Sequence, residues 1–407
     1  MGLTIDITSE IGALKKVMLH RPGKEVENLV PEYLGKLLFD DIPYIKVAQE
    51  EHDAFAQLFR QNGVEVLYLE ELAADAIHND KVKESFVEEF LKESGIVSRN
   101  VSDALKEYLM KMAPLELIYT VMAGVRKEDI SIKGKLSLSE LIGDDYEFYL
   151  DPMPNLYFTR DPAAAMGHGI SINRMHTEAR RRETLFIKYI HKYNPLFARQ
   201  DIPLWYSRDN LFSIEGGDQL VLSNSTIAIG CSERTGALGI ESFARSLFKE
   251  QEEFERILVF DIPKCRAYMH LDTVFTMVDF DKFTIHPGIS PALQVFEITR
   301  GTNGSLDIKN ENTSLQEALK KALRLPAVQL IECGGGDRII AGREQWNDGS
   351  NTLAIAPGTV ITYDRNYVTN GILDKSGIKV LPIKSSELSR GRGGPRCMSM
   401  PLNRERL

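Results

Sequence analysis

The sequence predicts a mixed α/β fold in which a small unit of strands and a helix is repeated around an axis. The order strand, strand, helix, strand recurs several times along the 407 residues. The segments SIEGGD at 213–218 and IECGGGD at 331–337 echo each other, and the strand pair QLVLSNSTIAIG has a counterpart in TLAIAPGTVITYDRN. Self-similarity of this kind is typical of repeat folds, so we expect the ends of corresponding strands to meet at one central site.

The N-terminal part opens with strand, helix and strand. Residues 12–20 predict a short strand that ends at a Pro-Gly turn, residues 47–62 carry apolar side chains at helical spacing, and residues 64–69 predict the next strand. His20 and Arg21 stand at the end of the first strand. We interpret both as surface charges.

Residues 72–148 have a different texture, rich in Glu, Lys, Leu and Met and poor in Gly. ESFVEEFLKESG and SDALKEYLMKM predict amphipathic surface helices, with Gly95 ending the first and Ser102 capping the second. Ser137 and Glu140 have the spacing of a capping box for a further helix. We therefore predict three parts: residues 1–71 as the first part of an α/β propeller domain, 72–148 as a helical insertion subdomain, and 149–407 as the remainder of the propeller domain.

A segment bracketed by prolines, LDPMPNLYFTRDP at 150–162, follows the insertion. It predicts a short aromatic strand that ends in a turn, around which Asn155, Phe158 and Asp161 come close together. The alternative is an ordinary Asp-Pro turn with a capped backbone. An arginine cluster at 174–184 either faces solvent or holds the carboxylate of a ligand, whose geometry the guanidinium fork matches.

Acidic side chains and a histidine fall on predicted strands and at their ends. Glu215 stands beside two glycines, which indicates an acid at a strand end with a close backbone approach. Residues 268–278, YMHLDTVFTMV, alternate as a strand, so His270 and Asp272 are expected on the same face. An imidazole beside a carboxylate is a candidate for acid and base catalysis, and the alternative is a structural histidine.

The tail, GRGGPRCMSMP at 391–401, surrounds one cysteine with glycines, arginines and prolines. Such a loop permits unusual backbone conformations, so Cys397 is predicted to be accessible rather than packed. Arg392 and Arg396 are expected to favour the thiolate, which is the reactive form. Cys397 is therefore a candidate nucleophile, and the alternative is a small buried apolar residue.

Composition limits the functions that are open to the chain. Apolar residues make up 43% and charged residues 26%, as in ordinary globular proteins, and the net charge of −9 argues against nucleic acid as a partner. No apolar run is long enough to span a bilayer. The four cysteines lie far apart, form no CxxC pair and accompany no secretory signal, which favours a reducing cytoplasm over a zinc ribbon or a disulfide-rich fold.

Long segments from most of the chain carry a family resemblance: LKKVMLHRPGKE, NLYFTRDP, EARRRET, IEGGDQLVLSNSTIAIGCSERT, MHLDTVF and GRGGPRCMSMPL. The chain resembles the arginine deiminase family of the guanidino-group modifying, or pentein, superfamily. The resemblance implies a five-bladed, pseudo-fivefold α/β propeller of ββαβ units with a helical insertion. It also implies hydrolysis of L-arginine to L-citrulline and ammonia without a metal or organic cofactor, in a homo-oligomer (dimer or tetramer).

The resemblance assigns catalytic roles to five of the residues. Cys397 matches the nucleophile of the family, and His270 matches its acid and base. Asp161 and Asp272 match the carboxylates that grip the guanidinium group. Glu215 matches the acid that contacts both the guanidinium group and the histidine.

A second set of residues matches the substrate-binding positions of the family. Asn155, Arg180 and Arg234 match the groups that hold the α-carboxylate of the substrate. Phe158 matches a residue that lines the pocket, and Arg392 matches a loop residue that occupies the empty site and moves on binding. The α-carboxylate contacts imply that free arginine, not protein-bound arginine, is the substrate.

The charges of this predicted site act on the thiol in opposite directions. Its three carboxylates would raise the pKa of Cys397, whereas Arg392 and Arg396 would lower it. Our hypothesis is that the substrate cation decides the matter by neutralising the carboxylates.

Three other functions compete with this one. Agmatine deiminases, dimethylarginine hydrolases and amidinotransferases share the Cys, His and carboxylates, and agmatine lacks the carboxylate that Arg180 and Arg234 would bind. A non-catalytic arginine-binding or adhesion protein would keep the pocket but has no need of Cys397. A metal hydrolase would need ligands at close spacing, which the Cys and His residues do not offer.

Overall fold

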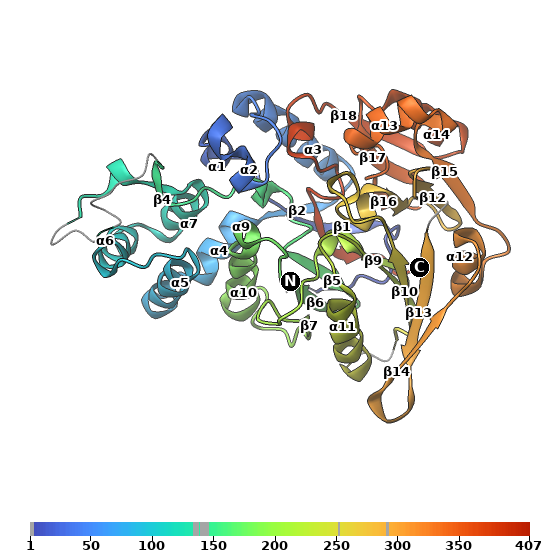
Figure 1. Cartoon of the computed structure of the whole chain (residues 1–407), viewed down its shortest axis with the longest axis horizontal. Coiled ribbons are helices and arrows are strands. Elements are labelled where there is room, and N and C mark those ends of the chain that lie inside the picture. The colour runs from blue at the N-terminus through green and yellow to red at the C-terminus, as the bar shows by residue number, and fades with distance from the viewer. Residues whose placement is uncertain (1–3, 133–137, 139–145, 251–252, 290–292) are drawn as a thin grey trace.

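The structure is a computed structural model, and it describes residues 4–132, 138, 146–250, 253–289 and 293–407. Strands and helices alternate along the chain, with small sheets at the centre and helices around them (Figure 1). No helix in these residues is both long enough and apolar enough to cross a membrane. The fold is a mixed α/β fold, and none of the sheets in the described residues closes on itself.

Five sheets of the described residues share one arrangement, in which an antiparallel pair of strands is extended by a third strand parallel to the middle one. Their strands, with the middle one second in each group, are β19 (Met400–Arg404), β1 (Leu14–Leu19) and β2 (Glu65–Tyr68); β5 (Ala163–Met166), β6 (Gly169–Ile172) and β7 (Leu204–Tyr206); β8 (Gln219–Ser223), β9 (Thr226–Cys231) and β10 (Arg256–Asp261); β11 (Phe275–Met277), β12 (Lys282–Ile285) and β15 (Gln329–Glu332); and β16 (Leu353–Ala356), β17 (Thr359–Tyr363) and β18 (Lys379–Ile383).

A helix lies between the middle strand and its parallel neighbour in each of these sheets, because parallel strands need a long crossover connection. These helices are α3 (Ile45–Gln61), α10 (Glu183–Tyr193), α11 (Ala237–Glu250), α12 (Leu315–Leu323) and α14 (Tyr367–Lys375). The recurrent order strand, strand, helix, strand predicted from the sequence is thus present. Other elements are α1 (Lys24–Glu27), α2 (Leu34–Leu37), α9 (Glu178–Arg181), α13 (Arg338–Trp346), β13 (Gln294–Arg300) and β14 (Leu306–Asn310).

Four consecutive helices follow β2 and form a lobe on the left of Figure 1: α4 (Leu69–Ala76), α5 (Asp80–Glu93), α6 (Arg99–Met110) and α7 (Pro114–Ala123). Gly95 follows the end of α5 with φ of 70°, as predicted. The cap predicted at Ser102 is wrong, because the Ser98 hydroxyl accepts the N–H of Val101 and starts α6 one turn earlier. The capping box predicted at Ser137 lies outside the described residues.

The lobe returns to the sheets through a short antiparallel pair, β3 (Val125–Arg126) and β4 (Phe148–Leu150). The aromatic strand predicted within 150–162 is wrong, since residues Pro154–Tyr157 form a 3-10 helix, η3. Proline lacks the N–H that a strand ladder needs. The N–H of Phe158 donates to the carbonyl of Asn155 instead, which turns the chain.

The last strand pairs with the first, since β19 runs antiparallel to β1. This pairing fixes the loop that precedes β19 against the N-terminal part of the chain. Cys397 and Met398 of that loop pack in a core cluster with Tyr157 and Phe158. The predicted nucleophile is therefore held between the two ends of the chain and the segment after the helical lobe.

Candidate active site

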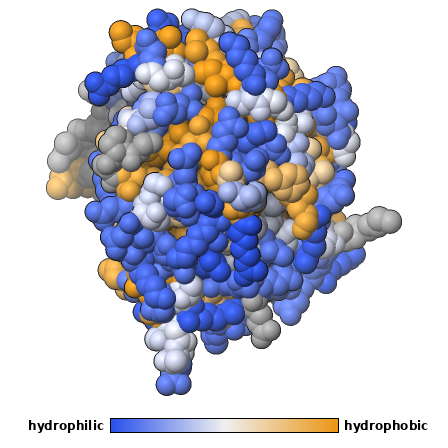
Figure 2. Space-filling model, turned by 90° about the vertical axis from the view of Figure 1, so that its right-hand side faces the viewer, coloured by the Kyte–Doolittle hydropathy of each residue, from blue (hydrophilic) through white to orange (hydrophobic). Residues whose placement is uncertain are grey.

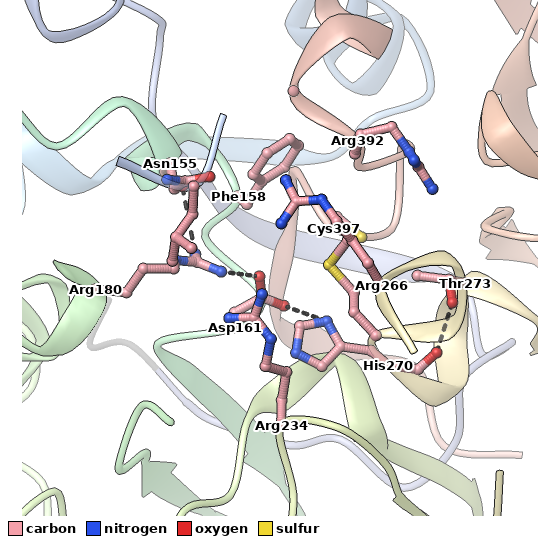
Figure 3. Close-up of a pocket in the computed structure, with 13 residues that line it drawn as sticks. Asn155, Phe158, Asp161, Arg180, Arg234, Arg266, His270, Thr273, Arg392 and Cys397 are labelled. Carbon is pink, nitrogen blue, oxygen red and sulfur yellow. Dashed lines mark hydrogen bonds and ion pairs between the residues drawn. The ribbon is translucent and has the colours of Figure 1, made fainter. Parts of the chain in front are cut away.

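A narrow cavity lies over Cys397 (Figure 3). Its lining comes from loops far apart in the sequence: Leu38, Asn155, Phe158, Asp161, Arg180, Arg234, Arg266, Met269, His270, Thr273, Gly391, Arg392 and Cys397. The cavity thus brings together all the predicted site residues except Asp272 and Glu215. Those two carboxylates lie directly behind the lining, Asp272 beside Cys397 and Glu215 beside His270.

The loop that carries the thiol is held by Asn351. The carbonyl oxygen of its side chain accepts the N–H groups of Arg396 and Cys397 at 3.1 and 3.2 Å, and its Nδ2 lies 3.2 Å from Sγ of Cys397. A Cβ at Gly394 would lie 2.7 Å from Oδ1 of Asn351, so only glycine permits this approach. Cys397 is 4% exposed, so the prediction of an accessible, unpacked thiol is wrong; the thiol is buried at the base of the cavity.

The two arginines of the tail do not favour the thiolate as predicted. Arg396 is buried, with Nε 3.0 Å from Glu10 Oε2 and Nη1 2.8 Å from Asp272 Oδ2. Its positive charge is therefore neutralised by those two carboxylates. Arg392 stacks on the ring of Trp346, with its guanidinium carbon 3.4 Å from the ring centroid. Burial, followed by the charges of Asp272 and other nearby carboxylates, raises the pKa of Cys397 well above its ordinary value.

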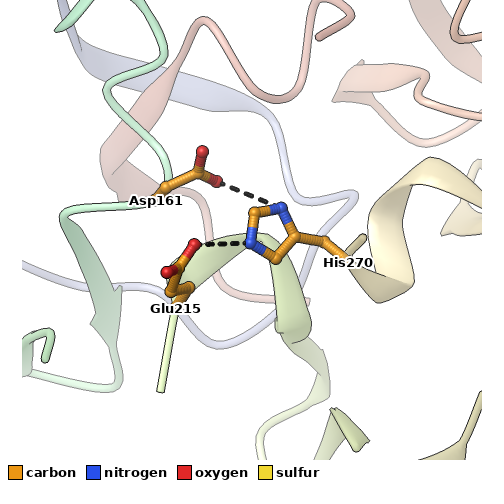
Figure 4. Close-up of side chains that lie close together, drawn as sticks. All are labelled: Asp161, Glu215 and His270. Atoms are coloured by element: carbon orange, nitrogen blue, oxygen red, sulfur yellow. Dashed lines mark hydrogen bonds and ion pairs between the residues drawn. The ribbon is translucent and has the colours of Figure 1, made fainter. Parts of the chain in front are cut away.

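His270 lies between two carboxylates (Figure 4). Its Nε2 is 2.7 Å from Glu215 Oε2, and its Nδ1 is 3.7 Å from Asp161 Oδ1. Burial lowers the pKa of His270, but the charge of Asp161 and the hydrogen bond to Glu215 outweigh burial and raise it to about 9. Burial raises the pKa of Glu215, but its hydrogen bond with His270 lowers it to about 2. At neutral pH the pair is an imidazolium and a carboxylate.

The strand predicted over 268–278 is wrong in its first half. Residues Leu271–Thr273 form a 3-10 helix, η6, and β11 begins only at Phe275. The buried carboxylate of Asp218 accepts the N–H of Leu271 at 2.7 Å and holds the chain in this turn. Consequently His270 and Asp272 do not share a strand face, and each meets a different partner.

Gly217, one of the two glycines beside Glu215, lies so close to His270 that a side chain would not fit there. A Cβ at Gly217 would lie 2.7 Å from the imidazole ring of His270. The close backbone approach expected from the pair of glycines is therefore found, and it lets His270 reach Glu215.

Asp161 and Asp272 each have one oxygen paired and one without a hydrogen-bond partner among the described residues. Oδ2 of Asp161 is 2.7 Å from Nη1 of Arg180, and Oδ2 of Asp272 is paired with Arg396 and lies 3.7 Å from Sγ of Cys397. Oδ1 is buried and accepts no hydrogen bond in either residue, although Oδ1 of Asp161 forms the 3.7 Å ion pair with Nδ1 of His270. Buried polar atoms are normally hydrogen-bonded, so these two oxygens indicate a site for a cationic donor beside the thiol.

The basic side chains of the cavity differ in how they are held. Arg180 donates to both oxygens of Glu183, with Nε 3.0 Å from Oε1, in addition to its contact with Asp161. Arg234 is buried, and its Nε has no hydrogen-bond partner in the described part of the chain. The amide of Asn155 donates to the carbonyl of Leu37 at 2.8 Å. Nε of Arg234 lies 3.8 Å from Oε1 of Glu233, and Nε and Nη1 of Arg392 also lack a hydrogen bond in the described part of the chain. Arg234 and Arg392 are thus both able to take an anionic group.

Several contributors to the cavity were missed in the sequence. Asn351 lies 46 positions before the thiol that it holds and stands in no motif of its own. Arg266 lines the cavity and lies 2.7 Å from Asp40, which joins the loop before His270 to the N-terminal part. Glu183 lies in the arginine cluster of residues 174–184. Its spacing of three residues from Arg180 could have indicated an ion pair between the two.

Asp161, Glu215 and His270 also place one possible ligand atom each within 4.8 Å of one another. Such a set could hold a metal ion, and sequence spacing gave no sign of it because the three residues come from separate segments. A ligating imidazole must be neutral, whereas the pKa of His270 is about 9. Binding of a metal ion here would therefore displace the proton that Asp161 and Glu215 stabilise on His270.

Comparison with known proteins gives a consistent result. A family model described as arginine deiminase matches residues 35–404. An arginine deiminase of Bacillus cereus (strain B4264) is 57% identical over 404 residues, which cover 98% of each chain. An arginine deiminase of Latilactobacillus sakei is 56% identical over 409 residues, which cover 100% of each chain.

Among solved structures, an amidinotransferase of saxitoxin biosynthesis from Microseira wollei is similar in fold. The TM-score is 0.58 with 14% sequence identity, and the match covers 99% of this chain and 98% of that one. At this identity the likeness concerns the fold alone, and it agrees with a mixed α/β arrangement of small sheets.

Proposed function

Because the chain belongs to the arginine deiminase family, we propose that it hydrolyses free L-arginine to L-citrulline and ammonia, with Cys397 as the nucleophile. The observation that carries the proposal is the pair of buried carboxylate oxygens, Oδ1 of Asp161 and Oδ1 of Asp272, that accept no hydrogen bond in the described residues and belong to the same site as that thiol. A guanidinium group is planar and always charged, and it carries donors that suit two carboxylates at once.

The guanidinium of the substrate takes its place between Asp161 and Asp272, which positions its central carbon next to Sγ of Cys397. At the other end of the cavity Arg234, Arg180 and Asn155 receive the α-carboxylate. Arg180 keeps Glu183 as a partner when it gives up its contact with Asp161.

Two further residues that line the cavity, Phe158 and Arg392, complete the substrate site. The ring of Phe158 packs beside the alkyl part of the substrate. Arg392 lies over Trp346 and acts at the entrance of the cavity, from which it can move as substrate enters.

The first half of the reaction forms a covalent adduct. Binding of the guanidinium cation neutralises the carboxylates that raise the pKa of Cys397, and the thiol loses its proton to solvent. The thiolate attacks the guanidinium carbon and gives a tetrahedral adduct. His270, an imidazolium stabilised by Glu215, donates its proton to the departing nitrogen, so that ammonia leaves and a thiouronium intermediate remains.

The second half consumes water. Neutral His270 takes a proton from a water molecule as the water oxygen attacks the thiouronium carbon. The second tetrahedral adduct collapses, the carbon–sulfur bond breaks, the proton of the new hydroxyl group passes to the departing thiolate, and citrulline leaves. Arginine and water have then become citrulline and ammonia, and both protein groups have returned to their starting states.

The five sheets and the helical lobe also have distinct parts in this proposal. The five sheets act as the blades of a pseudo-fivefold propeller around the cavity, which the common ββαβ order supports. Residues 72–148 act as a helical insertion subdomain between residues 1–71 and 149–407 of the propeller domain, which helices α4 to α7 support. A cytoplasmic location is supported by four cysteines that are all free.

The decisive experiment measures citrulline and ammonia released from L-arginine in the presence of EDTA by the wild type, by Cys397→Ser and by the control variant Cys265→Ser. Cys265 is an exposed free thiol outside the cavity lining. Equal release of both products by the wild type and the control, with none from Cys397→Ser, supports a metal-free cysteine deiminase. Loss of activity with EDTA would favour a metal hydrolase, and the absence of release by a folded wild type would reject the proposal.

Substrate choice is tested with agmatine and with dimethylated arginine. If Arg234 binds the α-carboxylate, agmatine is a poor substrate for the wild type, and Arg234→Gln reduces kcat/KM for arginine towards that for agmatine. A wild type that prefers agmatine or dimethylarginine would instead assign the chain to a different guanidine-modifying reaction.

A further inference from the structure

Asp218 is a buried carboxylate beside the proposed active site, and the reaction above does not use it. Hydrophilic side chains cover much of the face seen in Figure 2, whereas Asp218 is 0% exposed. It ends the 3-10 helix η4 (Gly216–Asp218), directly after Glu215, but it does not belong to the lining of the cavity over Cys397. A carboxylate is costly to bury without hydrogen bonds, so its partners indicate its role.

One oxygen of Asp218 fixes the turn that carries two site residues. Oδ1 accepts the N–H of Leu271 at 2.7 Å, and Leu271 stands between His270 and Asp272 in the chain. A Cβ at Gly230 would lie 2.3 Å from this oxygen, so a glycine on β9 lets the carboxylate reach the turn. Asp218 thus helps to place the imidazole and the carboxylate on either side of Leu271.

The other oxygen of Asp218 fixes the loop that carries Arg234. Oδ2 accepts the hydroxyl of Ser232 at 2.7 Å. Oγ of Ser232 in turn accepts the N–H groups of Arg234 and Thr235 at 3.0 and 3.1 Å. A hydroxyl group has one donor and two acceptor sites, so all three sites of Ser232 are used, and only an acceptor fits opposite its proton.

Asp218 needs these hydrogen bonds because burial opposes its charge. Burial raises the pKa of Asp218 to about 7, while the charge of His270 and the hydrogen bonds that the carboxylate accepts act in the opposite direction. Above that pH the carboxylate is ionised and accepts both hydrogen bonds.

Thr235 joins the same loop to the acid beside the histidine. Its Oγ1 accepts the N–H of Glu215 at 3.0 Å, and Oε2 of Glu215 lies 2.7 Å from Nε2 of His270 (Figure 4). Arg234 and His270 both line the cavity (Figure 3). One buried network therefore sets the position of Arg234 relative to His270.

We propose that Asp218 is a positioning residue that fixes Arg234 relative to His270. It acts through Ser232 on one side and Leu271 on the other, and it touches no substrate atom itself. Because Arg234 takes the α-carboxylate and His270 serves the guanidinium group, their spacing favours substrates that carry both groups at the matching distance. The proposal rests on the proposed function for these two roles.

The test measures binding of L-arginine and of agmatine by calorimetry in the Cys397→Ser background, about one pH unit above the pKa of Asp218. Ser232→Ala releases the loop of Arg234 but leaves the hydrogen bond from Leu271 to Asp218 intact. The Kd for arginine should rise about tenfold, since small displacements of a binding group are costly. The Kd for agmatine, which has no carboxylate, should stay within about twofold.

Asp218→Asn should disturb both sides of the network. The amide nitrogen that replaces one oxygen donates rather than accepts, so one side loses its hydrogen bond and the other keeps a weaker, uncharged acceptor. With Cys397 present, this variant should lower kcat for arginine and raise KM, each about tenfold, whereas Ser232→Ala should raise KM alone. A general loss of structure would not separate kcat from KM in this way.

Ser223→Ala is the matched control. The hydroxyl of Ser223 accepts the N–H of Ser225 at 3.3 Å, as that of Ser232 accepts the N–H of Arg234, but at the opposite end of β9. This control should keep both Kd values.

An unchanged Kd for arginine in Ser232→Ala, an equal loss for arginine and agmatine, or an Asp218→Asn variant with the kcat and KM of the wild type would overturn the proposal. A wild type that releases no citrulline would reject the proposed function. The two Kd values, which do not depend on turnover, would still decide the role of Asp218.

Discussion

Within the described residues, two buried histidines each lie between two carboxylates, and one of the two lies in the proposed active site. His270 lies 2.7 Å from Glu215 and 3.7 Å from Asp161, while His20 lies 2.7 Å from Glu70 and 3.2 Å from Glu25. In both cases the carboxylates outweigh burial, and the pKa rises to about 9 for His270 and to about 10 for His20. The electrostatics of the two clusters are therefore alike.

The neighbours of each imidazole separate them. His270 lines the cavity that also holds Cys397, and Oδ1 of Asp161 beside it accepts no hydrogen bond in the described residues. His20 is 0% exposed, and it joins the end of β1 to Glu25 of α1 and to Glu70 of α4, the first helix of the lobe. A raised histidine pKa thus occurs in a structural cluster as well as in a catalytic one. The adjoining thiol and the carboxylate oxygen without a hydrogen bond identify the catalytic cluster.

The largest expected difference between the clusters is in activity. His270→Gln removes the group that gives a proton to ammonia and takes one from water, so kcat should fall by about 10²–10⁴-fold. His20→Gln should leave kcat within about threefold, because His20 contacts no residue that lines the cavity. Steady-state citrulline release measures both, and comparable losses in the two variants would remove the distinction between the clusters.

The second difference is in stability, and it has the opposite order. His20→Gln leaves Glu25 and Glu70 buried without their cation, which should lower the free energy of unfolding by about 3–5 kcal/mol. His270→Gln should cost less, since the charges of Arg234 and Arg180 also act on Glu215. Denaturant unfolding of both variants checks this, and it fails if His270→Gln proves the less stable protein.

The third prediction concerns the thiol that distinguishes the catalytic cluster. Burial and the charge of Asp272 raise the pKa of Cys397, so alkylation by iodoacetamide should be slow at neutral pH in the free protein. Asp272→Asn should accelerate it about tenfold, the effect of roughly one pKa unit. Peptide mapping follows the reaction, with exposed Cys265 as the internal reference. Rapid alkylation of Cys397 near pH 6 in the wild type would contradict the assignment.

A pH dependence of stability should accompany these effects. A histidine whose pKa is raised on folding contributes stability below its unfolded pKa of about 6.5, and this contribution disappears as pH rises through the folded value. For the wild type the loss should extend from pH 6.5 to about 10 because of His20, and to about 9 because of His270. Denaturant unfolding across this range should show a smaller loss in His20→Gln than in wild type, and equal slopes would contradict it.

His20 shows where reasoning from the sequence was insufficient. His20 and Arg21 were both interpreted as surface charges, and this is right for Arg21, which is paired with Asp53 near the surface. It is wrong for His20, because the imidazole is buried against Glu70, a residue 50 positions further along the chain. Adjacent residues on a strand face opposite sides, and the sequence does not say which side α4 will cover.

The sequence by itself determined the order of strands and helices, the motifs of the family and the residue types needed for the chemistry, since these follow from local periodicity and from long matching segments. Only the tertiary structure decided which side chains meet: Arg396 contacts Glu10 and Asp272, and Asn351 contacts Cys397. It also decided that Asp218 holds residues 271–273 in a turn in place of a strand. The physical reason is that burial and distance set ion pairing and pKa, and both are properties of segments brought together from different parts of the chain.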